Sequence, residues 1–117
     1  MSGTVIQLEA LDAVPCPCGR SRRAFVEESG RACSVHMVEV TSAAKAHHHT
    51  RLTETYYVLE GEGDIELDGE RTPVRPGHAV LIRPGVVHRL LPSGGASMRI
   101  LNFVTPAFDA ADEFVEA

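Results

Sequence analysis

The hydrophobic and polar positions of this chain alternate over short stretches that glycine and proline interrupt. This pattern is typical of β-strands joined by tight turns, and no long helical period competes with it between residues 30 and 105. The Asp68-Gly69 pair predicts a hairpin, because Asp-Gly suits positive φ. We predict about seven or eight strands. The clearest of them cover residues 32–40, 56–59, 64–67, 72–75, 78–82, 88–91 and 98–104.

The two ends of the chain lack this regular alternation. Residues 10–24 contain Pro15, Pro17 and Gly19 and are predicted to form an irregular arm. Residues 109–115 predict one short C-terminal helix, with Asp109 as its N-cap and Phe114 facing the rest of the protein. The predicted fold class is therefore all-β, with an N-terminal arm and a short terminal helix.

Size and charge exclude several classes of function. A chain of 117 residues is long enough for one domain, predicted to cover residues 1–117 with its core over about 32–105. A net charge of −5 argues against a nucleic-acid partner, which requires clustered Lys and Arg. No secretory signal and no run of about 18 apolar residues is visible, so we expect a soluble, cytoplasmic protein that does not enter a membrane.

The N-terminal arm carries two motifs whose meaning the sequence leaves open. Cys16 and Cys18 have neither the C-x-x-C spacing nor a second pair to close a zinc site, so a proline-rich turn with reduced thiols is favoured over a metal or redox role. The basic cluster Arg20-Ser21-Arg22-Arg23 forms either a solvated, salt-bridged surface or a site that captures an anionic substrate.

Three histidines and one glutamate are spaced so that a small β-barrel would bring them together. Side chains alternate along a strand, so His47 and His49 point to one face. Glu54 shares that face only if the segment between bends or bulges. His88 follows the Pro84-Gly85 turn, which would deliver its imidazole from a neighbouring strand. Three imidazoles and one carboxylate form a donor set for a divalent metal.

These residues resemble the two motifs of the cupin superfamily, G-x5-H-x-H-x3,4-E-x6-G and G-x5-P-x-G-x2-H-x3-N. The first motif is matched by His47-x-His49, Glu54 and Gly61, and the second is nearly matched by Gly77, the Pro84-Gly85 turn and His88. The similarity covers about residues 41–92. The chain departs from the motifs at three positions: Thr41 replaces the first glycine, Arg83 replaces the proline and Pro92 replaces the asparagine. None of these is a ligand position.

The resemblance implies a small antiparallel double-stranded β-helix, or jelly-roll barrel, and one divalent metal held by His47, His49, Glu54 and His88. Four protein ligands leave room on a five- or six-coordinate ion for a substrate or O2. The donor set does not choose between iron, manganese, nickel and zinc. The family includes dioxygenases, isomerases, epimerases and lyases, and many of its members are homodimers, so we expect a small-molecule substrate and a homodimer.

Other polar residues are candidates for a role beside the metal. Tyr56 alternates in phase with Glu54 and is a candidate acid, base or orienting donor, and Glu60 and His36 are the further catalytic candidates. Asn102 and Arg99 lie on opposite faces of one predicted strand, so only one of them can line the cavity. We favour Asn102.

Two alternatives to an enzyme remain open at this point. The protein is either a non-catalytic module that binds or senses a sugar or an anion, with or without a metal, or mainly an assembly unit that pairs through its outer faces. Fold alone does not decide among these functions.

Overall fold

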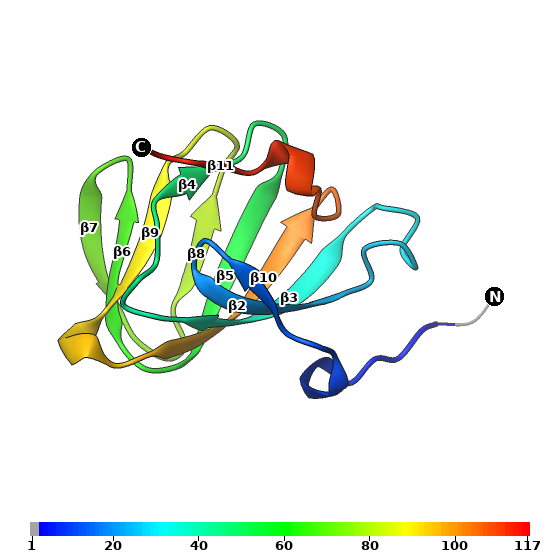
Figure 1. Ribbon diagram of the computed structural model, residues 1–117, viewed down its shortest axis with the longest axis horizontal. Helices are drawn as coiled ribbons and strands as arrows, with labels where there is room; N and C mark the ends of the chain where they lie inside the picture. The colour runs from blue at the N-terminus through cyan, green and yellow to red at the C-terminus, as the bar shows by residue number, and fades with distance from the viewer. Residues whose placement is uncertain (1–2) are drawn as a thin grey trace.

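The computed structural model describes residues 3–117, which form two antiparallel sheets and three short 3₁₀ turns (Figure 1). The six-stranded sheet contains, in spatial order, β1 (Val14–Cys16), β2 (Gly19–Ala24), β3 (Ser34–Val40), β10 (Met98–Thr105), β5 (Thr53–Glu60) and β8 (Ala79–Ile82). The five-stranded sheet contains β11 (Phe114–Val115), β4 (His47–His48), β9 (His88–Pro92), β6 (Gly63–Leu67) and β7 (Glu70–Val74). The all-β, antiparallel prediction is confirmed.

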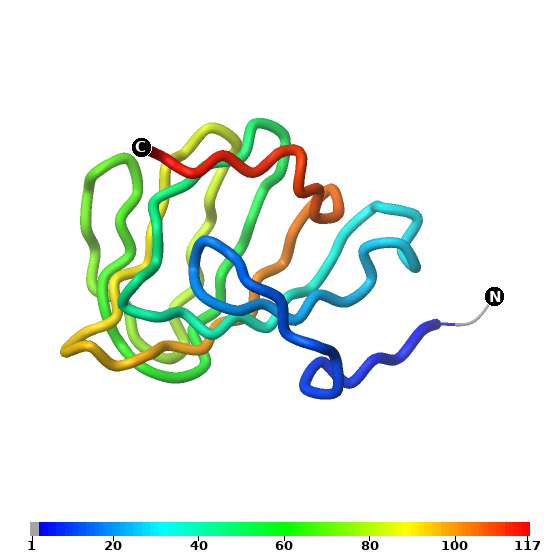
Figure 2. The backbone as a smooth tube through the Cα atoms, in the orientation of Figure 1, coloured from blue at the N-terminus to red at the C-terminus, as the bar shows by residue number. Residues whose placement is uncertain are grey.

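The core lies between the two sheets and follows from the alternation in the sequence. Along β3 and β10 every second residue is buried, so each strand presents a row of inward side chains, apolar along one half and polar at His36 and Asn102, to the opposite sheet. Val38, Val58 and Ile100 from the six-stranded sheet pack in one cluster with Ile65 and Leu90 from the five-stranded sheet. The path of the chain in Figure 2 shows that consecutive segments pass repeatedly from one sheet to the other.

Three features of the fold differ from the sequence prediction. The arm at residues 10–24 is not irregular: β1 and β2 form a hairpin that pairs with β3 and extends the sheet. The C-terminal helix is a single 3₁₀ turn, Ala110–Asp112, followed by β11, and Phe114 is exposed. The two sheets are also separate, so hydrogen bonding does not close them into a continuous barrel. The arm is regular because β2 forms backbone hydrogen bonds with β3, and these bonds override the local tendency of the prolines to disrupt a strand.

None of the helical turns in residues 3–117 has the length and apolar character that crossing a membrane requires.

The Asp112 carboxylate holds the bend that joins β4 to β5. One carboxylate oxygen accepts hydrogen bonds from the backbone N–H of Thr50 (2.8 Å) and from its hydroxyl. The other accepts from the N–H groups of Arg51 (2.8 Å) and Leu52 (3.2 Å). Burial alone would raise the pKa of Asp112, but the hydrogen bonds from Thr50 and the loop amides outweigh it and hold this pKa well below its usual range. The bend lies directly between His49 and Glu54, so Asp112 sets their relative placement.

We expect the Asp112→Ala variant to lose about 3 kcal/mol of unfolding free energy, because three backbone N–H groups of the bend lose a charged acceptor. Urea unfolding of the metal-free protein measures this loss. Asp12→Ala removes the same charge from an exposed side chain and serves as the matched control. Equal stability of the two variants would contradict the proposed role of Asp112.

Candidate metal centre

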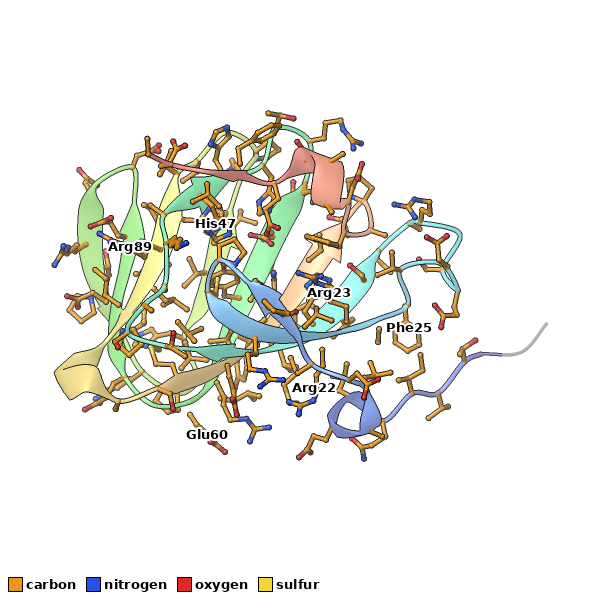
Figure 3. The ribbon with its side chains drawn as sticks, viewed as in Figure 1. Arg22, Arg23, Phe25, His47, Glu60 and Arg89 are labelled. Carbon is orange, nitrogen blue, oxygen red and sulfur yellow. The ribbon has the colours of Figure 1, made fainter. Side chains whose placement is uncertain are left out.

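Four buried side chains from both sheets converge on one point. His47 lies in β4, His49 directly after it, Glu54 in β5 and His88 in β9, and each is less than 5% exposed. One potential ligand atom from each residue lies within 4.8 Å of all the others. We call this set of four residues the His/Glu cluster. Figure 3 labels His47 in the space between the two sheets.

Backbone carbonyl groups orient two of the three imidazoles. His47 and His88 are directly paired across β4 and β9, and their rings lie 4.2 Å apart between centroids. Nδ1 of His47 lies 3.0 Å from the carbonyl oxygen of Lys45, and Nδ1 of His88 lies 2.9 Å from that of Val86. A carbonyl oxygen only accepts, so each Nδ1 carries the proton and each Nε2 keeps a free lone pair. This tautomer is the one that ligates a metal through Nε2.

The Pro84-Gly85 turn connects the two halves of the cluster. Gly85 has a φ of +87°, which glycine adopts without strain. Its N–H donates to the carbonyl oxygen of His49 at 2.6 Å. The turn that precedes His88 is therefore hydrogen-bonded to the residue that supplies another imidazole.

Glu54 is ionised, and a hydrogen bond holds one of its two oxygens. Nδ2 of Asn102 donates to Oε2 at 2.7 Å, and Nε2 of His88 lies 3.0 Å from Oε1. Burial alone would raise the pKa of Glu54, but His88, His49 and Asn102 outweigh it and lower this pKa to about 2. The cluster thus contains a buried carboxylate at neutral pH.

The buried atoms of the cluster fit a metal ion. Oε1 of Glu54 and Nε2 of His49 and of His88 are buried and have no partner with hydrogen-bond geometry. Leaving three such atoms unpaired is costly. One ligand atom from each member of the cluster lies within 4.8 Å of the others, so a divalent cation bound among the four side chains would provide a partner for Oε1 of Glu54 and Nε2 of His88.

His49 differs from its neighbours because two carboxylates face it. Its Nδ1 lies 3.5 Å from Oε1 of Glu54 and its Nε2 lies 3.8 Å from Oε1 of Glu113. Burial would lower the pKa of His49, but these two carboxylates outweigh it and raise this pKa. A metal that binds His49 therefore competes with protonation of this ring, and nothing in the sequence pattern marked Glu113 as a neighbour of the cluster.

A small cavity of about 20 Å³ lies beside the cluster, which is room for roughly one water molecule. Tyr56 and His36, two of the predicted catalytic candidates, line it together with Asn102 and Arg23. Burial raises the pKa of Tyr56 well above its ordinary value, so the phenol stays protonated. Burial, with a contribution from Arg23, lowers the pKa of His36 to about 4, so that imidazole is neutral.

Glu60 is not part of this cavity. It is exposed at the end of β5, where Arg99 donates to it at 3.1 Å, and Figure 3 places it at the edge of the molecule far from His47. Alternation along the strand predicted that Glu60 would share a face with Glu54. Glu60 nevertheless lies at the far end of β5, too distant from the His/Glu cluster to contact it. His48 points away from the cluster as predicted and stacks on Phe114.

The two cysteines of the β1–β2 hairpin also line the cavity. Both are free thiols, and Sγ of Cys18 lies 3.9 Å from the hydroxyl oxygen of Tyr56. The neighbouring Cys18 thiol is the main reason that the pKa of Cys16 is lowered to about 7. The proline-rich turn predicted at residues 15–19 is present in part: Pro15 and Cys16 belong to β1, and the turn itself consists of Pro17 and Cys18.

Comparison with known proteins identifies the family. A family model described as "Cupin domain" matches residues 34–104, and the chain therefore belongs to the cupin family. The protein is a cupin with a buried His/Glu cluster that could bind a metal.

Among proteins of known structure, the chain is similar to one from Planctomyces limnophilus at 38% identity and a TM-score of 0.86, covering 97% of this chain and 96% of that one. It also shares its fold with Pac13, a nucleoside dehydratase, at 21% identity and a TM-score of 0.79, over 98% of this chain and 92% of Pac13. A structure of a variant of the Streptomyces Pac13 contains uridine.

In sequence, the chain is similar to L-ectoine synthase of Halomonas elongata. The two are 32% identical over 65 residues, which are 53% of this chain and 47% of the synthase. The chain spans between about half and two thirds of the length of the curated relatives that it matches.

The unfolding free energy of the metal-free protein is expected to fall as the pH drops from 6.5 to about 4. In this window the unfolded chain takes up protons at His36 and His47 before the folded protein does, because burial lowers both folded-state pKa values to about 4. The contribution of the neutral His36 and His47 rings to the unfolding free energy is fully present above pH 6.5 and is lost as the pH falls from 6.5 to about 4. His49, with its raised pKa, acts in the opposite sense.

Urea unfolding at a series of pH values measures this dependence. A His36→Gln variant removes one of the two groups and should show a shallower decline. An unchanged slope in that variant would contradict the assignment of a neutral, buried His36.

Proposed function

We propose that this cupin is a metal-dependent enzyme that acts on a small molecule, and that its reaction belongs to the lyase or isomerase class. The observation that carries the proposal is the group of three buried, unpartnered ligand atoms beside a cavity lined by a protonated phenol and a neutral imidazole. A divalent ion held by His47, His49, Glu54 and His88 would polarise a carbonyl or hydroxyl oxygen of the substrate. Iron, manganese, nickel and zinc all suit these donors.

Tyr56 and His36 are the proposed acid and base. In the six-stranded sheet, Asn102 of β10 is paired with Tyr56 of β5 on one side and with His36 of β3 on the other. The two groups therefore stand on the same inner face, one strand from Asn102 in each direction. At neutral pH burial keeps the Tyr56 phenol protonated and the His36 imidazole uncharged, so we assign Tyr56 as the proton donor and His36 as the acceptor.

Asn102 is proposed to position Glu54 rather than to react. Its amide donates to Oε2, which leaves Oε1 directed at the other ligand atoms of the cluster. A ligand carboxylate fixed in this way keeps its orientation when a metal binds or leaves.

The comparisons support this class of reaction. Pac13 is named a nucleoside dehydratase, and a dehydratase eliminates water, which is lyase chemistry. L-ectoine synthase is a second named enzyme among the matches. A dioxygenase uses a similar donor set, but it does not require the acid and base that line this cavity.

Metal content tests the proposal directly. Tag-free protein expressed in medium supplied with iron, manganese, nickel and zinc is expected to hold about one equivalent of metal, measured by plasma mass spectrometry. His49→Ala is expected to lose most of it, because an N3O set loses one of its four ligands. His48→Ala is the matched control, since this neighbouring imidazole faces away from the cluster and stacks on Phe114.

The outcomes separate the candidate functions. A wild type that stays metal-free after reconstitution would contradict the enzyme proposal and favour a module that binds a small molecule without turnover. O2 consumption with a candidate substrate would favour a dioxygenase over a lyase or isomerase.

We also propose that the protein is a homodimer that pairs through the outer face of its six-stranded sheet. Large apolar side chains are exposed there, and the strand register places Phe103 and Leu81 on either side of Thr55 in one row, with Tyr57 in the next. Contiguous exposed apolar surface of this kind is typical of interfaces. A cytoplasmic location, expected from the sequence, stays a prediction.

Light scattering after size-exclusion chromatography is expected to give twice the chain mass of 12.6 kDa. Phe103→Glu should shift the protein to a monomer, because it places a charge in the apolar row. Glu70→Ala on the exposed β7 edge should not change the mass. A monomeric wild type would contradict the proposed interface.

A further inference from the structure

The β1–β2 hairpin, blue in Figure 1, brings two thiols together at its turn. Cys16 is the last residue of β1 and pairs with Gly19 across the hairpin, and Pro17 and Cys18 form the turn between them. The ring of Pro17 fixes its own φ, which limits the freedom of this turn. The two side chains lie close enough that the Cys18 thiol donates a hydrogen bond to the sulfur of Cys16.

The two thiols differ in their access to solvent. Cys18 is 7% exposed, and its Sγ lies 3.9 Å from the hydroxyl oxygen of Tyr56. Cys16 is only half-buried, and it also lines a surface pocket of about 520 Å³. A small solute in this pocket therefore reaches Cys16 first, and Cys18 is the thiol behind it.

The surface pocket favours the thiolate form of Cys16. Arg20 and Lys45 line the pocket, and Glu113 is the single acidic side chain among the described residues around it. Nearby cations stabilise a thiolate, which is the nucleophilic form of cysteine. The hydrogen bond from Cys18 contributes most and lowers the pKa of Cys16 to about 7, although burial opposes it.

Cys18 has the opposite character and stays protonated. Its hydrogen bond to Cys16 and its burial raise its pKa well above the ordinary value. The C-x-C spacing alone favoured a turn with reduced thiols, because it matches no common redox motif. The structure adds an accessible sulfur that favours the thiolate and a second thiol in contact with it, which is the arrangement of cysteines that respond to oxidants.

We propose that Cys16 and Cys18 form a redox-active pair that hydrogen peroxide, or another small hydroperoxide, oxidises to an intramolecular disulfide. The Cys16 thiolate attacks one peroxide oxygen, the O–O bond breaks, and the products are a Cys16 sulfenic acid and hydroxide. Cys18 gives its proton to this hydroxide and attacks the Cys16 sulfur, which breaks the S–O bond and releases a second hydroxide. That hydroxide takes up the proton that Cys16 had released. The two thiols together lose two electrons and two protons, and the peroxide becomes two molecules of water.

The pair lies in a wall that the surface pocket shares with the small cavity beside the His/Glu cluster, because Cys16 lines both. A disulfide has no S–H group, so an oxidised Cys18 can only accept a hydrogen bond from the Tyr56 phenol. Oxidation would therefore change the surroundings of the proposed acid. Only this effect on Tyr56 rests on the proposed function, since the thiol chemistry requires neither a metal nor a substrate.

Peptide mapping of the full chain tests the pair after a chelator has removed any metal, which excludes metal-driven peroxide chemistry. The protein is treated with hydrogen peroxide, labelled with N-ethylmaleimide in urea and digested with trypsin. Cleavage after Arg20 leaves Cys16 and Cys18 together in the peptide 1–20, and Cys33 falls in another peptide. The peptide 1–20 is expected to lose both labels and the mass of two hydrogens, and to regain the labels after treatment with dithiothreitol. Its oxidation should be about ten times faster than that of Cys33.

Variants of the three free cysteines assign the steps. Cys33→Ser is the matched control and should form the disulfide at the rate of the wild type. Cys18→Ser should stop at the sulfenic acid of Cys16, which dimedone traps, and Cys16→Ser should lose the fast reaction. The wild-type peptide decides the question even if the Cys18→Ser variant does not fold.

Three results would overturn the pair: a peptide 1–20 that keeps both labels, oxidation of Cys33 at the same rate, or a disulfide that includes Cys33 or joins two chains. Non-reducing electrophoresis detects the last of these. Because the test uses metal-free protein, disulfide formation would support the pair even if the His/Glu cluster proved unable to bind a metal.

Discussion

The structure depends on keeping a group of polar, ligand-bearing side chains buried between two apolar sheet faces. The five-stranded sheet supplies His47 and His88, and the six-stranded sheet supplies Glu54. Their ligand atoms meet within 4.8 Å only while the sheets stay packed on the core formed by both. Because three of these atoms lack partners, the cluster opposes folding and the surrounding apolar packing must offset it. The site is thus preorganised at the expense of stability, which is the usual relation between a functional centre and its scaffold.

Environment rather than residue type assigns the roles along the inner face of the six-stranded sheet. Tyr56 and His36 are both buried, yet burial keeps the phenol protonated and the imidazole neutral, because in each case it disfavours the charged form. Glu54 is the exception, since the neighbouring imidazoles and Asn102 hold it ionised in the same surroundings. One apolar environment therefore contains a proton donor, a proton acceptor and an anion at neutral pH.

The sequence identified what depends on spacing and alternation. The strands between residues 32 and 105, the four members of the His/Glu cluster and the bend before Glu54 follow from period-two patterning and from motif spacing. It did not identify what depends on distant contacts. Prolines suggested an irregular arm, whereas pairing with β3 makes it a hairpin. Asp109 as an N-cap suggested a helix over residues 109–115, whereas the chain forms only one 3₁₀ turn there and Asp112 points inward to the β4–β5 bend. Local propensity is weaker than such tertiary hydrogen bonding.

The contact between Asp112 and the β4–β5 bend has a consequence for the order of events during protein synthesis. The carboxylate and the Thr50 amide that it accepts from are 62 residues apart in the chain. The ribosome completes all four cluster residues well before Asp112 leaves its exit tunnel. During that interval the Asp112 carboxylate cannot yet hold the bend between His49 and Glu54. The four side chains of the His/Glu cluster are therefore synthesised before the group that sets their relative placement, and the cluster reaches its folded geometry only afterwards.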